Sequence, residues 1–240
     1  MKKISFNEMQ YDLLMIASGG ILPDDYQIPK KQMGYWIKNQ YAKWMKQEMW
    51  KGRAIPQAFV TDLGCITLET VDRAECCDIN IGCSIKRTAV EMPRFVRLKN
   101  GSAVTRIGPI DKLRIAYDII LYERAPYIGN QMFGNQATFA FWRNERIYII
   151  SKHASYIATQ RKINVQGVLE DFTNARDFTT CSGDMCWTPN SPMPISRDMI
   201  DYMKAEVLKL NLEYFLKVPE DNTNDASGSN TSEEKAEQQS

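Results

Sequence analysis

The stretch ATFAFWRNERIYIIS, residues 137–151, is typical of a β-hairpin. Two apolar runs flank a polar centre, and Asn144 is a residue type that tight turns favour. The stretches CITLETV (65–71) and KINVQGVLEDF (162–172) also have strand patterns. Gly167 in the latter indicates a bulge or a close approach of the backbone. From about residue 59 onward, the sequence therefore predicts a β-rich region.

A second hairpin is predicted in RFVRLKNGSAVTRI, residues 94–107. Its turn is expected at Asn100–Gly101, because this dipeptide favours the type I′ turn that joins antiparallel strands. The strands can be recognised one by one in this way. Their order in the sheet does not follow from the sequence.

Helical patterns lie on both sides of this region. Ser5 and Glu8 have the spacing of a capping box, and apolar residues follow at helical intervals. A longer helix is predicted over residues 31–51, and a last helix is predicted to begin with Ser196 as its N-cap. The predicted fold class is α+β, with N-terminal helices, a β-rich central domain with antiparallel hairpins, and one closing C-terminal helix.

These patterns divide the chain into four regions. They are an N-terminal helical region (1–53), a β-rich central region (54–195), a C-terminal helix (196–218) and an acidic tail (219–240). The tail has six acidic residues and one lysine, so the net charge of residues 1–218 is +6 (+1 minus −5). The tail cannot bury enough apolar surface to offset its ordering entropy, and the sequence predicts that it is disordered.

The composition limits the possible classes of protein. The 240 residues are 44% hydrophobic and 25% charged, which is ordinary for a soluble globular chain. No apolar run approaches the roughly 20 residues that cross a bilayer, and the N-terminus lacks a signal-peptide core. The protein is therefore expected to act without secretion or membrane insertion, in a reducing compartment where structural disulfides are rare.

Few residues of the chain suggest catalysis. The single histidine, His153, follows a predicted strand in a polar turn and is interpreted as a surface-loop residue. Most hydrolases and many transferases use a histidine base, and the phosphate-binding glycine motifs are also missing. The acidic pairs Asp24–Asp25 and Glu170–Asp171 lie where turns and strand ends explain them. The sequence predicts a protein that is not an enzyme and has no cofactor.

The cysteines raise the question of a zinc site. Their positions are Cys65, Cys76, Cys77, Cys83, Cys181 and Cys186. A structural zinc site has four thiolate or imidazole ligands, usually in pairs separated by two to four residues. The pair in CSGDMC (181–186) is at the edge of this range, and the pair in ECCDINIGC (75–83) is outside it. We expect reduced, packed thiols and no bound metal, although the sequence leaves open whether the two clusters meet.

The predicted second helix is strongly basic. Between Lys30 and Arg53 there are seven basic residues and one acidic residue, interleaved with three tryptophans. One interpretation is contact with DNA phosphates or with an acidic partner. The candidate residues are Lys38, Lys43, Lys46 and Lys51. The other interpretation is a solvated basic face opposite an aromatic stripe that packs in a core or an interface.

The apolar stripes of the two long helices are candidate interfaces with partner subunits. Methionine and aromatic residues are enriched at protein interfaces, and the chain has 12 Met, 5 Trp and 11 Tyr. The candidates are Trp36, Tyr41, Trp44 and Met49 in the second helix and Ile200, Met203, Val207, Leu210 and Tyr214 in the last.

Several stretches together form a recognisable pattern. They are FVTDLGCITLETVDRAECC (59–77), GCSIKRTAVEMPRFVRL (82–98), RIGPIDK (106–112) and the two long helices, YWIKNQYAKWMKQEMWKGR (35–53) and MPISRDMIDYMKAEVLKLNLEYFL (193–216). This pattern resembles the head-to-tail connector proteins of crAss-like tailed bacteriophages. The resemblance covers most of residues 30–218. Cys76, Cys77 and Cys83 belong to the stretches that carry the resemblance, which favours a shared feature of the sheet over metal chemistry.

The resemblance implies a virion structural protein at the head–tail junction, assembled in the host cytoplasm. It would form a homo-oligomeric, dodecameric ring that connects the capsid portal to the tail and extends the DNA channel. Its partners would be its own copies, the portal protein and adjacent tail or ring proteins, with passive contact with DNA. A nucleic-acid-binding module, stabilised by zinc through its cysteines, is the alternative hypothesis.

Overall fold

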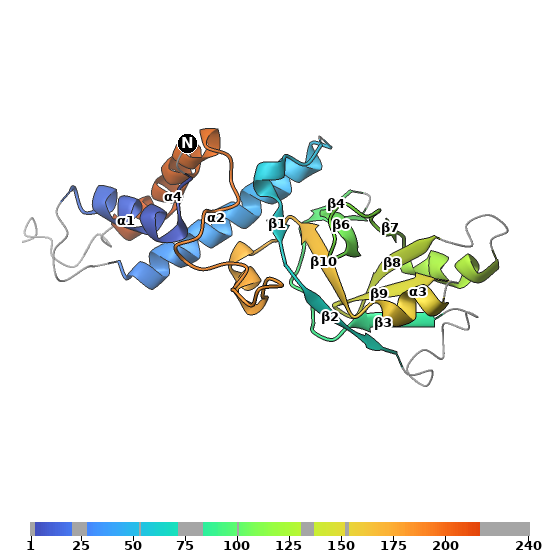
Figure 1. The fold of residues 1–240 in the computed structure, drawn as a ribbon. Coiled ribbons are helices and arrows are strands. Elements are labelled where there is room, and N and C mark those ends of the chain that lie inside the picture. Colours follow the sequence, from blue (N-terminus) through green and yellow to red (C-terminus); the bar gives the residue numbers. More distant parts are fainter. Residues whose placement is uncertain are drawn as a thin grey trace, which may run out of the picture.

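The computed structural model describes residues 3–20, 28–52, 54–71, 84–99, 101–130, 137–151 and 154–216. The long helices lie at one end of the molecule and the strands at the other (Figure 1). This arrangement confirms the predicted α+β class. The predictions made for His153, for Cys76, Cys77 and Cys83, and for the acidic tail lie outside the described residues.

Three helices form the helical end: α1 (Phe6–Ala17), α2 (Lys30–Trp50) and α4 (Asp198–Leu216). The predicted capping box is present at the start of α1. The backbone N–H of Glu8 donates to Ser5 Oγ at 3.2 Å, and the backbone N–H of Ser5 donates to Glu8 Oε2 at 2.8 Å. Helix α2 packs against both α1 and α4. Among the described residues, no helix has both the length and the apolar character needed to cross a membrane.

The predicted N-cap of the last helix is wrong. Helix α4 begins at Asp198, and Ser196 lies in the turn before it. The backbone N–H of Met199 donates to the carbonyl oxygen of Ser196, so the chain enters the helix through a tight turn. The hydroxyl of Ser196 is buried and has no hydrogen-bond partner in the described part of the chain. The side chain therefore does not provide the cap that its position suggested.

The strands form one large curled sheet and one small one. Their bounds are β1 (Thr61–Asp62), β2 (Ile66–Thr70), β3 (Ser84–Thr88), β4 (Arg97–Leu98), β5 (Gly101–Ser102), β6 (Val104–Pro109), β7 (Asp118–Ile119), β8 (Thr138–Arg143), β9 (Arg146–Ser151) and β10 (Lys162–Gly167). The order is β1-β10-β2-β3-β9-β8-β7, and β6 pairs with the other side of β10. Among these pairs only β7 and β8 run parallel. Strands β4 and β5 form the small sheet.

Short helices lie between the strands and between the sheet and the long helices. They are α3 (Ala154–Thr159) and the 3₁₀-helices η1 (Gln57–Phe59), η3 (Tyr122–Asn130) and η4 (Phe172–Asp177). The sequence patterns did not predict them, because three to nine residues are too few to show a helical period clearly.

The two predicted hairpins have different outcomes. Strands β8 and β9 pair around Asn144 and Glu145, whose φ angles are 48° and 58°, as a type I′ turn requires. In the second hairpin Leu98 pairs with Gly101, so the turn begins one residue earlier than predicted. Beyond Ala103 the chain leaves that hairpin, and β6 pairs with β10.

Gly167 has both features that its sequence context predicted. The register between β10 and β6 shifts between Gln166 and Gly167, which marks a bulge. A Cβ atom at Gly167 would lie 2.6 Å from Phe95 Cε1 and 2.7 Å from the carbonyl oxygen of Ala103. Any side chain here would collide with the neighbouring segment, so glycine is needed at this position.

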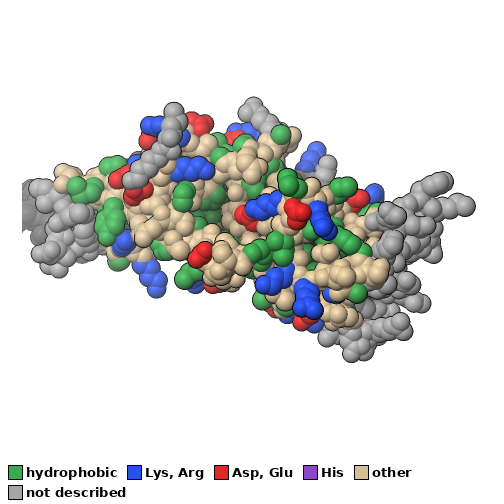
Figure 2. All heavy atoms as spheres, in the orientation of Figure 1, with side chains coloured by type: hydrophobic (Ala, Val, Ile, Leu, Met, Phe, Trp, Pro, Cys, Tyr) green, Lys and Arg blue, Asp and Glu red, His purple; other side chains and the backbone are tan. Residues whose placement is uncertain are grey.

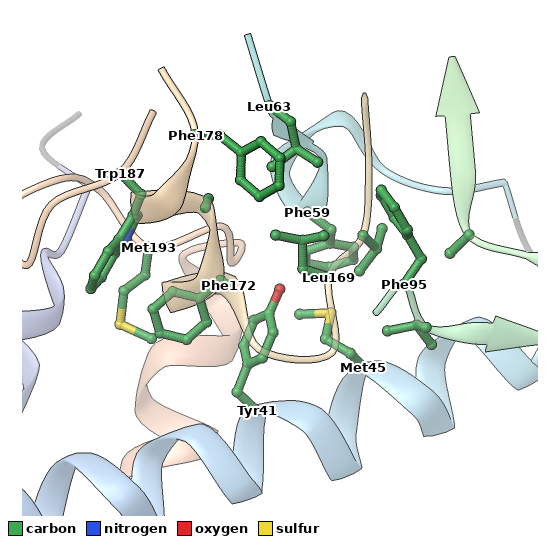
Figure 3. Packing of buried hydrophobic residues seen from close by; sticks show 14 of the residues in the cluster. Tyr41, Met45, Phe59, Leu63, Phe95, Leu169, Phe172, Phe178, Trp187 and Met193 are labelled. Atoms are coloured by element: carbon green, nitrogen blue, oxygen red, sulfur yellow. The ribbon is translucent and has the colours of Figure 1, made fainter. Parts of the chain in front are cut away.

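The main core joins the helices to the sheet. In Figure 3, Tyr41 and Met45 extend from α2 toward Phe59, Phe172 and Leu169. The rings of Phe172 and Trp187 meet edge to face, with centroids 5.6 Å apart. The core therefore brings together α2 and segments from both halves of the chain. A smaller cluster of Ala125, Phe141, Tyr148 and Ile150 packs beside η3.

Candidate functional site: surfaces for assembly

The candidate interface residues of α2 pack mostly in the chain's own core. Trp36, Tyr41 and Met49 are buried, and Tyr41 has no exposed surface. Trp44 is partly buried and meets Phe59 edge to face, with ring centroids 5.9 Å apart. In the structure of the single chain, these four side chains attach α2 to the core.

The stripe of α4 is divided between the core and the surface. Met203 and Val207 are buried against the other helices. Ile200 is partly buried and lines a groove, and Leu210 is 49% exposed. The side chain of Tyr214 lies outside the described residues. Of the predicted interface residues, Ile200 and Leu210 are thus the ones best placed to contact another molecule.

The candidate lysines of α2 differ in their surroundings. The ammonium group of Lys38 lies 2.8 Å from Asp171 and also donates to the hydroxyl of Thr173. Lys51 forms an ion pair with Glu48 in the same helix, and Lys46 lies over the ring of Trp50. Lys43 is exposed. On the face drawn in Figure 2, basic and acidic side chains are interspersed, without a continuous basic surface.

The pairing of Lys38 with Asp171 connects α2 to the residue that caps η4. Burial raises the pKa of Asp171, but the hydrogen bonds from Lys38 and Thr173 outweigh it, so the net pKa of the carboxyl is lowered. The carboxylate also accepts a hydrogen bond from the backbone N–H of Thr173. Lys38, which the sequence made a candidate for contact with DNA or an acidic partner, thus joins two elements of the fold.

The expectation of reduced, buried thiols is wrong for Cys65. It forms a disulfide with Cys181, with the two Cα atoms 5.1 Å apart. Cys65 is half-buried and Cys181 is exposed. The two residues are 116 positions apart in the sequence, so no spacing rule relates them. The bend of the chain at Gly64, between β1 and β2, brings Cys65 to the loop of Cys181.

Cys186 is a free thiol near this disulfide. A Cβ atom at Gly64 would lie 2.8 Å from its sulfur, so the described cysteines gather around this bend. Burial, and next the negative charge of Asp62, raises the pKa of Cys186 to about 11. The thiol is therefore protonated at neutral pH and is a poor metal ligand. Within the described ranges, no group of three or more His, Cys, Asp or Glu residues is placed to hold a metal ion.

A groove of about 370 Å³ lies between the starts of α1 and α4, and we call it the α1–α4 groove. Its lining is Lys3, Ile4, Glu8, Asp12, Arg197 and Ile200. The two isoleucines provide apolar surface, and charges of both signs surround them. Lys204 of α4 forms an ion pair with Asp12 of α1 at 2.8 Å, which holds the two walls together. Of these lining residues, the sequence analysis proposed only Ile200 as an interface residue. The groove itself could not be predicted, because its walls come from opposite ends of the sequence.

A second surface feature is the loop between β6 and β7, residues 110–117. Leu113 is 98% exposed and Ile115 is 91% exposed, whereas Ile110 is exposed to a lesser degree. Sequence reasoning did not single out this loop. The sequence feature that could have indicated this loop is IDKLRI, directly after Pro109, where aliphatic residues are interspersed with charged ones.

Comparison with known protein families adds one match. The family described as phage tail ring protein 2 matches residues 8–235, which include α2, α4, the sheet and the loop between β6 and β7. A comparison with curated proteins finds no match.

Proposed function

The chain belongs to the family of phage tail ring protein 2, and from this membership we propose that it is a structural subunit of a homo-oligomeric ring in the virion. The observation that supports this most strongly is the length of the family match. It covers residues 8–235 and therefore the whole described fold after α1 begins. The proposed role needs no catalytic residues and no cofactor.

The finer part of the proposal concerns the place of the ring. We place a dodecameric ring at the head–tail junction, between the portal protein and the adjacent tail or ring proteins, where it extends the DNA channel. The support is the resemblance of residues 30–218 to connector proteins of crAss-like phages. In this proposal the rings assemble in the host cytoplasm, and packaged DNA passes through them without specific contacts.

The shape of the chain suits such a role. Identical subunits close into a ring through two different surfaces, each of which meets the other on the next copy. Figure 1 shows an elongated chain, with α1 and α4 at the helical end and the connection from β6 to β7 in the β-rich part. The α1–α4 groove and the exposed loop are thus separate surfaces on one subunit.

The alternative function, a zinc-stabilised nucleic-acid-binding module, has weaker support. Cys181 is bonded to Cys65 and does not provide a thiolate. Two of the four candidate lysines, Lys38 and Lys51, form ion pairs within the chain. The exposed lysine Lys43 remains suitable for passive contact with DNA in a channel.

Electron microscopy and analytical ultracentrifugation of the purified full chain test the ring. We expect closed rings, and class averages that show twelve subunits would support the dodecamer. Co-sedimentation of the rings with purified portal protein tests the finer part of the proposal. A stable monomer at high protein concentration, with stoichiometric zinc and salt-sensitive binding to DNA, would contradict the proposed function and favour the alternative.

A further inference from the structure

The loop between β6 and β7 is exposed but firmly held. The guanidinium of Arg106 donates to the carbonyl oxygens of Asp111 and Arg114, at 3.4 and 3.2 Å. The backbone N–H of Leu113 donates to the carboxylate of Asp111 at 3.1 Å. Lys112 forms an ion pair with Asp62 of β1. Each of these contacts restricts the loop backbone from a different side.

The end of the loop is attached to β6. The backbone N–H of Tyr117 donates to the carbonyl oxygen of Ile107 at 2.7 Å. A Cβ atom at Gly108 would lie 3.2 Å from Cα of Ala116, so the two segments are in close contact. This contact brings together β6 and β7, the two edges of the curled sheet. The loop therefore projects from the seam where the sheet comes nearest to closing.

The held loop presents two aliphatic side chains to solvent. Leu113 and Ile115 are almost fully exposed, although the chain has a large core in which aliphatic residues are buried. Exposing apolar surface to water is unfavourable, and burying it is the main driving force of protein association. A loop already fixed in one conformation also loses less entropy when it binds. These two properties are those of a docking element.

We propose that this loop inserts Leu113 and Ile115 into the α1–α4 groove of a neighbouring copy of this chain. The inference rests on the proposed ring, because a ring requires one surface of each kind on every subunit. The loop is a projection on the β-rich part of the molecule, beside β1, and the groove is a recess at the helical end. Repeating this contact from copy to copy joins subunits head to tail.

The chemistry of the two surfaces is complementary. Ile4 and Ile200 provide the apolar lining of the groove, and the loop has Leu113 and Ile115. Around these apolar side chains, both surfaces carry charges. Arg114 of the loop, which also pairs with Asp111, is basic and would lie near Glu8 and Asp12 of the groove. Asp111 would meet Lys3 and Arg197. An apolar centre within a polar rim is the usual composition of a protein interface.

The first test is the loop variant L113D/I115D. Both side chains are solvent-exposed in the single chain, so its melting temperature should equal that of the wild type. Its dissociation constant between copies should rise at least about a hundredfold, because the substitutions place two charges in the apolar centre. The matched control is V90D/M185D, which adds the same charge at two exposed apolar residues elsewhere and should assemble normally.

The second test uses the groove. Ile200→Asp places a charge in its apolar lining and should also prevent assembly. Because Ile200 packs partly on the core, the double variant K3E/R197E is a second choice, which reverses two charges at the rim. A head-to-tail contact predicts that a loop variant and a groove variant, each monomeric alone, form a 1:1 heterodimer when mixed. Each heterodimer joins the intact groove of one copy to the intact loop of the other.

Sedimentation velocity distinguishes the outcomes. Monomeric variants that form heterodimers on mixing would support the proposal. Normal rings from L113D/I115D, or the absence of heterodimers, would overturn it and leave the proposed ring function standing. Loop variants that form rings but fail to bind another phage protein would assign the loop to that protein, against the proposal. A wild-type chain that remains monomeric throughout would overturn the proposed function as well.

Discussion

The ring of Tyr41 packs edge-on against the ring of Phe172, with centroids 4.8 Å apart and planes at 74°. The contact joins α2 to η4, and Figure 3 shows it at the centre of the main core. The hydroxyl of Tyr41 is buried and has no hydrogen-bond partner among the described residues. Burial, and next the charge of Asp171, raises the pKa of this phenol well above its usual range. The aromatic ring of Tyr41 therefore stabilises the fold, and its hydroxyl does not.

Removing this hydroxyl is expected to stabilise the protein. A buried polar group without a partner costs about 1–3 kcal/mol of desolvation, so Tyr41→Phe should raise the free energy of unfolding by about 1 kcal/mol. Urea denaturation measures the change. Tyr41→Leu is the control, because it removes the edge-on contact with Phe172 and should destabilise the protein. If Tyr41→Phe lowers the stability instead, the hydroxyl has a hydrogen-bond partner in the folded protein.

The pair of Lys38 and Asp171 predicts a pH-dependent stability. The folded-state pKa of Asp171 is lowered, so the stability from its carboxylate is complete above the ordinary value of about 4. This stability is lost as the pH falls through the lowered folded-state pKa, since the unfolded state binds the proton more readily. Lys38→Met should therefore lower the free energy of unfolding at pH 7 by up to about 1 kcal/mol. Below the lowered folded-state pKa of Asp171, the difference from the wild type should nearly vanish.

The exposed Lys43 on the same helix supplies the control for this experiment. Lys43→Met changes the net charge equally and should leave the pH profile of stability unchanged. If the stability difference between the wild type and Lys38→Met stays constant as Asp171 is protonated at acid pH, the lysine acts through packing and not through the charge of Asp171.

The disulfide between Cys65 and Cys181 should contribute to stability in an oxidising solution. It closes a loop of about 116 residues, and disulfides typically stabilise by about 2–4 kcal/mol. The variant C65S/C181S should melt at a lower temperature than the wild type, and a reducing agent should lower the wild type to the level of the variant. Cys186→Ser should melt like the wild type. A variant as stable as the wild type would argue against the bond.

Gly167→Ala should destabilise the protein through a collision with Phe95 and with the carbonyl oxygen of Ala103. Forcing an extra methyl group into a packed site typically costs about 1–3 kcal/mol. Because Phe95 is one of the two colliding groups, Phe95→Ala should reduce the additional cost of Gly167→Ala, and a double-mutant cycle measures this coupling. Additive effects would show that the backbone contact alone restricts the site.

Features that depend on neighbours in the sequence could be predicted. The turn of β8 and β9 follows from Asn144 between two apolar runs, and the start of α1 follows from Ser5 and Glu8. The need for glycine at position 167 followed from its place inside a strand pattern. The exception is Ser196, where a suitable residue type at a helix start forms no capping hydrogen bond. Residue type alone does not decide between a cap and the tight turn that the structure has.

By itself, the sequence determined the three long helices, the hairpin of β8 and β9 and the fold class, because these depend on short-range patterns. Only the tertiary structure decided that Tyr41 and Val207 pack in the chain's own core, and that Cys65 pairs with Cys181. It also joined Asp12 of α1 to Lys204 of α4 and placed Leu113 and Ile115 in solvent. A helical stripe has the same spacing whether its own chain or a partner covers it, and contacts between distant residues have no spacing that the sequence displays.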